Sequence, residues 1–185
     1  MWASGFFCVV SAASIMDAAA LERALTRMAH EIVENNLDCG SLAFVGIHTH
    51  GVPMARRLAA KVGAIVKQEF PVGELDISMH RDDLALRDSP PNVGPSHIAF
   101  DVTGKSIVLV DDVLFTGRSI RAAMDEISDF GRPQRIQLAI LIDRGHRELP
   151  IRPDYVGKSI PTAANERVRV RLMEVDGRDE VVIER

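Results

Sequence analysis

The chain has 185 residues, of which 46% are hydrophobic and 26% charged, ordinary proportions for a single globular domain. Its formal net charge of −4 argues against indiscriminate binding to polyanions, so any contact with nucleic acid requires a local basic patch. No apolar run approaches the roughly 18 residues of a membrane span. Cys8 and Cys39 have neither CxxC nor zinc-site spacing, which favours a reduced, cytoplasmic setting.

The first predicted element is a helix that begins after Asp17, a suitable N-terminal cap, and ends near Asn36. The apolar residues on one face of this helix are Leu21, Ala24, Leu25, Met28 and Ile32. Residues 1–14 precede it, and their short apolar run lacks the preceding Lys or Arg of an export signal. We interpret residues 1–14 as an extension, either an edge strand or a frayed end, with a signal peptide as the alternative.

A strand, a helix and a second strand follow. Residues 42–47 are apolar and predict a strand. The helix after it is expected to bury Val52, Ala55, Leu58, Ala59, Val62 and Val66. Residues 75–79 alternate between apolar and polar, which predicts a half-buried strand. Residues 81–96 contain three prolines and predict a long loop, a feature that is usually functional or disordered in a compact domain.

The most informative stretch is residues 106–119. Ile107–Val110 predicts a strand buried on both faces, as in parallel sheets. Asp111 and Asp112 follow at its carboxyl end, where open α/β sheets bind ligands. The turn Thr116–Ser119 then opens a helix, and its N–H groups and hydroxyls suit a phosphate dianion. Carboxylates beside a phosphate cradle fit a sugar phosphate, and the alternative is an ordinary strand followed by a capped helix.

The remaining elements complete an alternating pattern. The helix after residue 119 is expected to bury Ile120, Ala123, Met124 and Ile127 and to end at Gly131 and Pro133. Residues 136–142 predict another buried strand. Beyond Asp143 the chain is strand-like and irregular, with Val168, Val170 and Leu172 alternating with arginines. The alternation of strands and helices predicts an α/β fold, a parallel sheet flanked by helices on both faces.

Two other segments have residues suited to phosphate. Thr49, His50 and Gly51 lie in a second strand–turn–helix loop, whose hydroxyl, imidazole and close backbone suit a pyrophosphate, with a plain turn as the alternative. Arg81, Asp82 and Asp83 begin the long loop. Arg81 suits a phosphate and the aspartates suit Mg²⁺, and a solvated charge cluster is the alternative.

Four stretches resemble the PyrR family of pyrimidine operon attenuation regulators, which are also uracil phosphoribosyltransferases. They are residues 24–31, residues 81–84, the acid pair with its phosphate loop, and residues 138–158. The resemblance covers about residues 15–183. It implies a type I phosphoribosyltransferase fold, α/β, with a parallel sheet flanked by helices. A single domain at residues 15–185 would have a small hood formed mainly by residues 144–185.

The resemblance also implies an enzymatic reaction: uracil and 5-phosphoribosyl-1-pyrophosphate (PRPP) give uridine monophosphate (UMP) and pyrophosphate, with Mg²⁺ held through PRPP by Asp111 and Asp112. The ribose and 5-phosphate residues would be Asp111, Asp112, Val113, Leu114, Phe115, Thr116, Gly117, Arg118 and Ser119. Those at the pyrophosphate would be Thr49, His50 and Gly51, with Arg81, Asp82 and Asp83 in a flexible loop. Uracil or the nucleotide would be bound by Arg144, Val156, Gly157 and Lys158.

The family's second role is to bind the leader RNA of pyrimidine biosynthesis transcripts, stimulated by uridine nucleotides such as UMP and UTP. The matching RNA-face residues are Thr26, Arg27, His30, Arg147, Arg152 and Lys158, although an ordinary solvated surface is the alternative. The resemblance further implies a homo-oligomer without a membrane partner.

Four positions depart from the family pattern. His50 stands where relatives usually have arginine, and His48 where they commonly have Lys or Arg, which favours weaker or pH-dependent PRPP binding. Asn35 replaces a frequent arginine, which counts against tight RNA binding, and His80 replaces a frequent tyrosine. The alternative function is therefore an RNA-binding attenuator that senses nucleotides with negligible catalysis. A phosphoribosyltransferase for another base is disfavoured by the match of residues 143–158.

Overall fold

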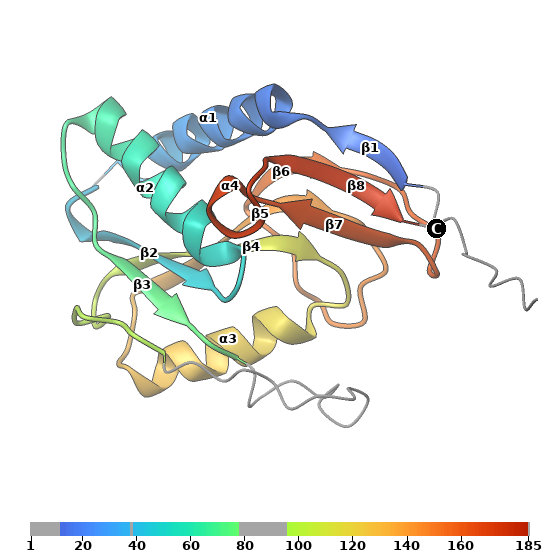
Figure 1. Ribbon diagram of the computed structural model, residues 1–185. Helices are drawn as coiled ribbons and strands as arrows, with labels where there is room; N and C mark the ends of the chain where they lie inside the picture. Colours follow the sequence, from blue (N-terminus) through green and yellow to red (C-terminus); the bar gives the residue numbers. More distant parts are fainter. Residues whose placement is uncertain (1–11, 38, 78–95, 185) are drawn as a thin grey trace, which may run out of the picture.

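The computed structural model describes residues 12–37, 39–77 and 96–184. Within these ranges, eight strands and four α-helices, with one short 3₁₀ turn at Cys39–Ser41, form two sheets and their covering layers (Figure 1). The helices are α1 (Ala18–Asn35), α2 (Gly51–Val66), α3 (Arg118–Asp129) and α4 (Met173–Asp176). The strands are β1 (Ala12–Met16), β2 (Leu42–Ile47), β3 (Val72–Leu75), β4 (Ser106–Leu114), β5 (Arg135–Asp143), β6 (Tyr155–Ser159), β7 (Arg167–Arg171) and β8 (Glu180–Glu184).

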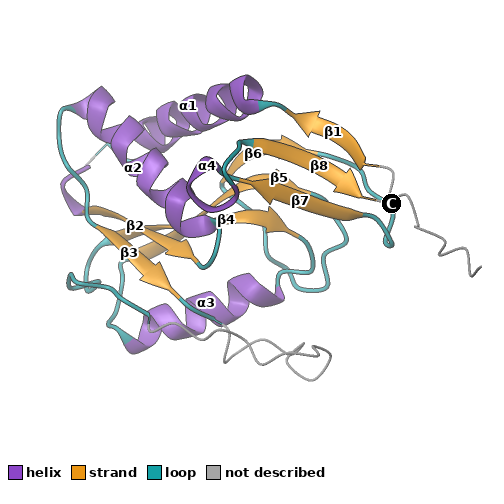
Figure 2. Cartoon of the chain, in the orientation of Figure 1, coloured by secondary structure: helices purple, strands orange, loops and turns teal. Residues whose placement is uncertain are grey.

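The larger sheet has five parallel strands in the order β3-β2-β4-β5-β6. Helices α1 and α2 cover one face, and α3 covers the other (Figure 2). This arrangement confirms the predicted parallel sheet flanked by helices. Because all five strands run the same way, their carboxyl ends meet at one edge, where β2 leads into α2 and β4 leads into α3.

Strand β4 divides the core into two parts because its side chains alternate between the two faces. Val108 and Val110 pack in a cluster with α1 and α2, whereas Ile107 and Leu109 pack in a second cluster with α3. All four side chains are fully buried. The prediction of a strand buried on both faces is therefore confirmed.

A small antiparallel sheet, in the order β1-β8-β7, lies beside α1 and α2. Its inward residues Val170, Val181 and Ile183 belong to the same core cluster as α1 and α2. Strand β6 pairs with β5 in the larger sheet, so the segment 144–185 contributes to both sheets. Strand β1 begins within the segment interpreted as an extension and pairs with β8.

Most predicted boundaries agree with the structure to within a few residues. Asp17 caps α1 by accepting a hydrogen bond from the N–H of Ala20 at 2.7 Å, as expected. The strand predicted at residues 75–79 is wrong in position, because β3 ends at Leu75. Val66 and Met124, both expected to be buried, are only half-buried. Residues 1–11, including Cys8, residues 78–83 with His80 and Arg81, Asp82 and Asp83, and the loop as far as residue 95 lie outside the described residues.

The described part of the chain also bears on the predictions about membrane spans and cysteines. None of the helices in the described ranges is long and apolar enough to cross a lipid bilayer. Cys39 is a free thiol whose Sγ lies 2.9 Å from the carbonyl oxygen of Asn36.

Candidate phosphoribosyltransferase site

The carboxyl end of β4 holds the two acids. The N–H of Asp112 donates to the Asp111 carboxylate at 2.9 Å, and the N–H of Val113 donates to the Asp112 carboxylate at 2.8 Å. Burial raises the pKa of the Asp112 carboxyl, although the charge of His50 and the N–H of Val113 act in the opposite direction. The N–H of Val113 therefore orients the Asp112 carboxylate, which lies at the edge of the core.

The loop after the acids leads directly into α3. Gly117 precedes the helix with φ 94°, a left-handed conformation that favours glycine. The N–H of Arg118 points to the Thr116 hydroxyl at 3.4 Å. This loop presents the first N–H groups of an α-helix together with two hydroxyls, as an anion-binding turn requires.

The second predicted phosphate loop lies against the first. Gly51, the first residue of α2, packs so closely on β4 that a Cβ there would lie 2.4 Å from the carbonyl oxygen of Val110 and 3.3 Å from the Cα of Asp111. Only glycine fits this contact. The N-terminus of α2 therefore adjoins the acid pair, and the structure brings the Thr49–Gly51 loop and Asp111–Asp112 together as predicted.

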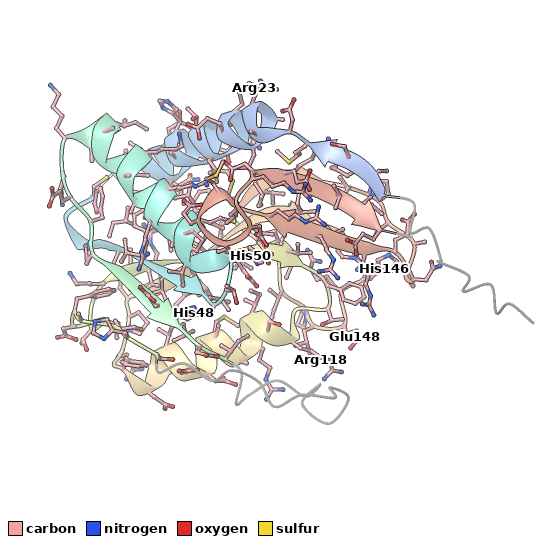
Figure 3. All side chains as sticks on the ribbon, viewed as in Figure 1. Arg23, His48, His50, Arg118, His146 and Glu148 are labelled. Atoms are coloured by element: carbon pink, nitrogen blue, oxygen red, sulfur yellow. The ribbon has the colours of Figure 1, made fainter. Side chains whose placement is uncertain are left out.

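His50 lies between two carboxylates from distant parts of the chain. Its Nδ1 is 3.5 Å from the Asp112 carboxylate, and its Nε2 is 3.0 Å from the Asp176 carboxylate of α4. Figure 3 shows His50 where α2 approaches α4. His48, by contrast, faces Glu74 of β3 at 3.3 Å. The two histidines of the loop thus have different partners, and only His50 contacts the acid pair.

Sequence reasoning missed the way in which α4 is attached to this site. The Arg57 guanidinium of α2 donates to both oxygens of Glu174, at 2.8 and 2.5 Å, and to both oxygens of Asp179, at 2.9 Å each. These hydrogen bonds lower the pKa of both carboxyls. In the sequence, Glu174 and Asp179 resemble ordinary solvated acids near the end of the chain. No local pattern therefore indicated their contact with Arg57.

The predicted base-binding residues lie beyond the acid pair. Arg144 is only 7% exposed. Its guanidinium lies 4.1 Å from the centre of the Phe115 ring and donates to the Thr162 hydroxyl and to the Ala163 carbonyl. Burial lowers the pKa of Arg144. The structure therefore brings Arg144 to the phosphate loop through Phe115.

Comparison with known proteins identifies the family. A model of the phosphoribosyl transferase domain matches residues 11–173. The bifunctional protein PyrR of Chloroflexus aurantiacus is 57% identical, over 91% of this chain and 93% of the relative. That of Thermus aquaticus is 56% identical, again over 91% and 93%. The chain belongs to the PyrR family.

Solved structures agree at the level of fold. The hypoxanthine phosphoribosyltransferase of Trypanosoma cruzi superposes with a TM-score of 0.71 at 13% identity, covering 93% of this chain and 95% of that enzyme. A mutant of that enzyme, in a ternary substrates complex, gives a TM-score of 0.73 at 15% identity, covering 93% of this chain and 94% of that enzyme. The predictions of the PyrR family and of the type I phosphoribosyltransferase fold are both confirmed.

The predicted RNA-face residues of this PyrR-family chain differ in how they are engaged. Arg27 donates to the carbonyl oxygens of Val156 and Gly157, at 2.7 and 2.6 Å. Lys158 donates to the carbonyl of Ile15 at 3.2 Å, and the Thr26 hydroxyl to its own helix. His30 and Arg152 are exposed and make no side-chain hydrogen bond within the described part of the chain. Arg147 donates to the carbonyl oxygen of Phe115 at 2.8 Å.

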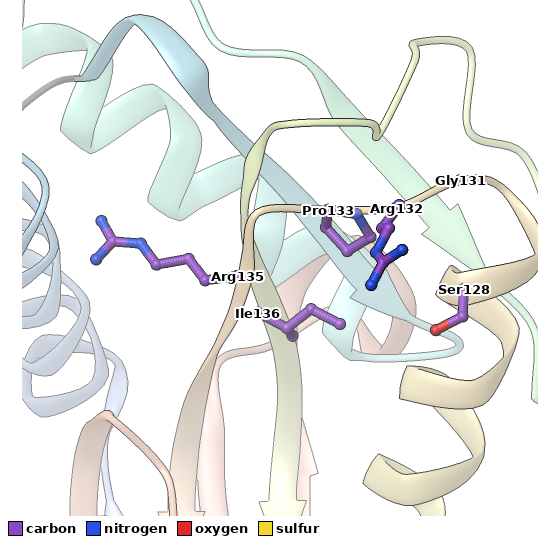
Figure 4. Close-up of a pocket in the computed structure, with 6 residues that line it drawn as sticks. All are labelled: Ser128, Gly131, Arg132, Pro133, Arg135 and Ile136. Carbon is purple, nitrogen blue, oxygen red and sulfur yellow. The ribbon is translucent and has the colours of Figure 1, made fainter.

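A cavity of about 680 Å³ lies at the edge of the larger sheet opposite to the acid pair, where β5 begins (Figure 4). It is lined by residues at the end of α3 and the start of β5: Ser128, Gly131, Arg132, Pro133, Arg135 and Ile136. Arg135 turns away from it to donate to the Asn36 side chain at 2.5 Å. This cavity contains none of the predicted site residues of the PyrR-family chain.

The donor set at the acid pair fits Mg²⁺ brought by a phosphorylated substrate. Carboxylate oxygens are ligands that Mg²⁺ accepts, and it usually binds through one or two of them together with substrate phosphates. Within residues 12–37, 39–77 and 96–184, no group of three or more His, Cys, Asp or Glu side chains is arranged to hold a metal. Asp111 and Asp112 offer carboxylate oxygens of this kind next to the phosphate turn.

Proposed function

We propose that the chain catalyses phosphoribosyl transfer from PRPP to uracil at the edge of the larger sheet where the carboxyl ends of the strands meet. Membership of the PyrR family makes the chain a uracil phosphoribosyltransferase that also regulates pyrimidine transcripts. The observation that best supports the proposed site is the close packing of Gly51 on Val110 and Asp111, because it sets two phosphate loops on either side of one acid pair. PRPP has a phosphate at one end of its ribose and a pyrophosphate at the other, so it matches an arrangement of two phosphate loops beside one acid pair.

In the proposed mechanism, the Thr116–Ser119 loop binds the 5-phosphate through N–H groups and hydroxyls. Asp111 and Asp112 accept hydrogen bonds from the ribose hydroxyls, and their charge stabilises the positive charge that develops on the sugar as its bond to pyrophosphate breaks. His50 and Thr49 bind the departing pyrophosphate. Mg²⁺, when bound with PRPP, neutralises part of the pyrophosphate charge. No nucleophilic side chain is required, since positioning and charge stabilisation suffice for the transfer.

Arg144 and the backbone of Val156–Lys158 are proposed to bind the base. Arg144 lies beside the phosphate loop, and the carbonyls of Val156 and Gly157 are held by Arg27. The Arg27 guanidinium thereby fixes the strand that would face uracil. Arg81, Asp82 and Asp83 are proposed to close over the substrates and exclude water.

The direct test is formation of UMP from uracil and PRPP, followed with and without Mg²⁺ between about pH 6 and 9. We expect UMP and pyrophosphate in equal amounts, and product only when Mg²⁺ is present. Absence of product across that whole pH range would leave the alternative, a nucleotide-sensing attenuator with negligible catalysis, which the histidines at positions 48 and 50 favour.

The regulatory role is proposed to use the exposed part of the RNA face, His30 and Arg152, with UMP or UTP as effectors. Since the chain has a net charge of −4, binding to a pyrimidine leader RNA must depend on this local patch and weaken with salt. We expect His30→Ala with Arg152→Ala to lower the affinity at least tenfold, whereas Arg121→Ala on α3 leaves it unchanged. Equal affinity of both variants would exclude this face.

Two further properties are proposed from the family resemblance. The chain is expected to form a homo-oligomer, which analytical ultracentrifugation measures directly. It is also expected to work in the cytoplasm, where PRPP and nascent transcripts occur together.

A further inference from the structure

The phosphate loop is held from behind by a single segment, residues 143–151, which we call the brace. The carbonyl oxygens of Leu114, Phe115 and Thr116 all accept hydrogen bonds from it. The donors are the N–H of Arg144 to Leu114 at 3.2 Å, the Arg147 guanidinium to Phe115 at 2.8 Å and to Leu114 at 3.4 Å, and the N–H groups of Glu148 and Leu149 to Thr116 at 3.0 and 3.1 Å. Three consecutive peptide groups of the loop are thus fixed by one neighbour.

Arg147 is the centre of the brace. Its guanidinium forms an ion pair with Asp143 at 2.6 Å and also donates to the carbonyls of Gly145 and Ile151, at 3.2 and 3.1 Å. With Leu114 and Phe115, five groups accept from one side chain, of which only 22% is exposed. The planar fork of an arginine supplies five N–H donors, so this environment uses the donor capacity that lysine lacks.

The position of these carbonyls determines where the loop's N–H groups point. In a trans peptide the C=O and the following N–H point in opposite directions. Because the carbonyls of Leu114, Phe115 and Thr116 are held toward the brace, the next N–H groups, of Phe115, Thr116 and Gly117, point away from it. A phosphate therefore meets N–H donors, and the carbonyl dipoles that would repel it are held on the far side.

Other contacts keep the brace in place. Glu148 forms an ion pair with Arg118, at 2.9 Å, and the two are labelled side by side in Figure 3. A Cβ on Gly117 would lie 3.3 Å from Ile151 and 3.5 Å from Leu149, so that the brace packs directly on the turn. The loop and the brace therefore behave as one packed unit.

We infer that Arg147 is a positioning residue of the 5-phosphate loop: its guanidinium holds the loop carbonyls away from the ligand so that the N–H groups face the phosphate. The inference rests on the proposed function for the identity of that phosphate. It differs from the sequence prediction, which placed Arg147 on the RNA face.

The test compares two fragments of PRPP as inhibitors competing with PRPP in the UMP-forming reaction. Ribose 5-phosphate probes the braced loop, and inorganic pyrophosphate probes the other loop. We expect Arg147→Gln to raise the inhibition constant of ribose 5-phosphate about tenfold. The loop carbonyls lose the hydrogen bonds from the guanidinium, so the N–H groups are no longer held toward the phosphate. The inhibition constant of pyrophosphate should stay within about twofold, which general unfolding would not allow.

Two other variants make the test decisive. Arg147→Lys keeps the charge and most of the side chain, yet should show the same selective loss, since one ammonium cannot reach five acceptors. It decides the matter if Arg147→Gln does not fold. Arg121→Gln, an exposed arginine of α3, is the matched control and should leave both inhibition constants unchanged.

The inference is overturned if Arg147→Lys and Arg147→Gln bind ribose 5-phosphate as the wild type does, and a selective loss of RNA affinity would then assign Arg147 to the RNA face. A wild-type chain that binds neither fragment would instead refute the proposed function itself.

Discussion

Asp112 combines a functional position with an unfavourable environment. Burial raises the pKa of its carboxyl above the ordinary 3.8, against the opposing charge of His50. A carboxyl whose pKa is higher in the folded state destabilises the fold when ionised. That cost is absent below the ordinary pKa and fully present once the pH exceeds the folded value. Active sites commonly retain such groups at a cost in stability.

Asp112→Asn is therefore expected to change stability and activity in opposite directions. At neutral pH its melting temperature should rise by about 2–4 °C, the shift expected for about 1 kcal/mol in a chain of this size. The rate of UMP formation should fall by about 10²-fold or more, because a negative charge beside the reacting sugar is lost. Thermal scans at pH 7 and near pH 3 measure the first effect, which should vanish at the lower pH. Unchanged activity would remove Asp112 from the proposed mechanism.

His50 is expected to limit the affinity for PRPP. An arginine at this position is charged at every working pH and offers more donors than imidazole. His50→Arg should lower the KM for PRPP by roughly threefold or more. Asp112 and Asp176 are both placed to accept from the new guanidinium. Steady-state kinetics with PRPP as the varied substrate would test this, and a KM that rises in the variant would contradict it.

The local structure around single residues was predictable where it lies within one short segment of sequence. Asp111 and Asp112 end a buried strand and precede a phosphate turn, and all of this is visible within residues 106–119. The contact between His50 and Asp176 was not predictable. The two residues lie 126 positions apart, and only the packing of α4 against α2 brings them together.

Helix α4 illustrates how an element too short to be stable alone is held in place. It has only four residues, and Arg57 ties both Glu174 and Asp179 to α2. Asp176 accepts from the N–H of Leu172 at 2.9 Å and from His50. Although burial opposes it, these hydrogen bonds lower the pKa of Asp176. The three acids in and beside α4, Glu174, Asp176 and Asp179, therefore all have lowered pKa values and stabilise the fold when they are ionised.

Arg57→Ala should loosen α4 and reduce stability in a pH-dependent way. Carboxyls whose pKa is lowered by folding contribute stability above their ordinary pKa values, and they lose it as the pH falls through the folded values. We expect the variant to melt about 2–6 °C lower than the wild type at pH 7, since a partly buried charge network is lost. The difference should shrink toward pH 3. A difference independent of pH would show that Arg57 stabilises α4 through packing alone.

At the level of elements, the sequence predicted best what local physics determines. Helix α1 was predicted closely because Asp17 caps it and its apolar spacing is regular. Strand β3 was predicted too far along the chain. Its position is set by parallel pairing with β2, from Phe44 opposite Val72 to Ile47 opposite Leu75, and no local alternation records that register.

Across the whole molecule, α1 connects the proposed base site with the proposed RNA face. Arg27 lies on the exposed side of α1, one turn before Glu31, with which it forms an ion pair. The same guanidinium donates to the carbonyls of Val156 and Gly157 in β6. His30 shares the exposed side of α1 without such a contact among the described residues. The two side chains thus offer a matched pair for separating the functions.

Arg27→Ala is expected to impair both activities, whereas His30→Ala impairs only RNA binding. Without Arg27 the β6 carbonyls lose two charge-assisted hydrogen bonds, so the KM for uracil should rise about threefold to tenfold. RNA affinity should fall in both variants. For Arg27→Ala, the slope of log affinity against log salt concentration should also become shallower by about one unit, since one fewer phosphate is neutralised. Uracil kinetics and RNA titrations at two salt concentrations, with and without UMP, measure these effects. If Arg27→Ala binds RNA more weakly but leaves the KM for uracil and the response to UMP unchanged, α1 does not connect the two sites.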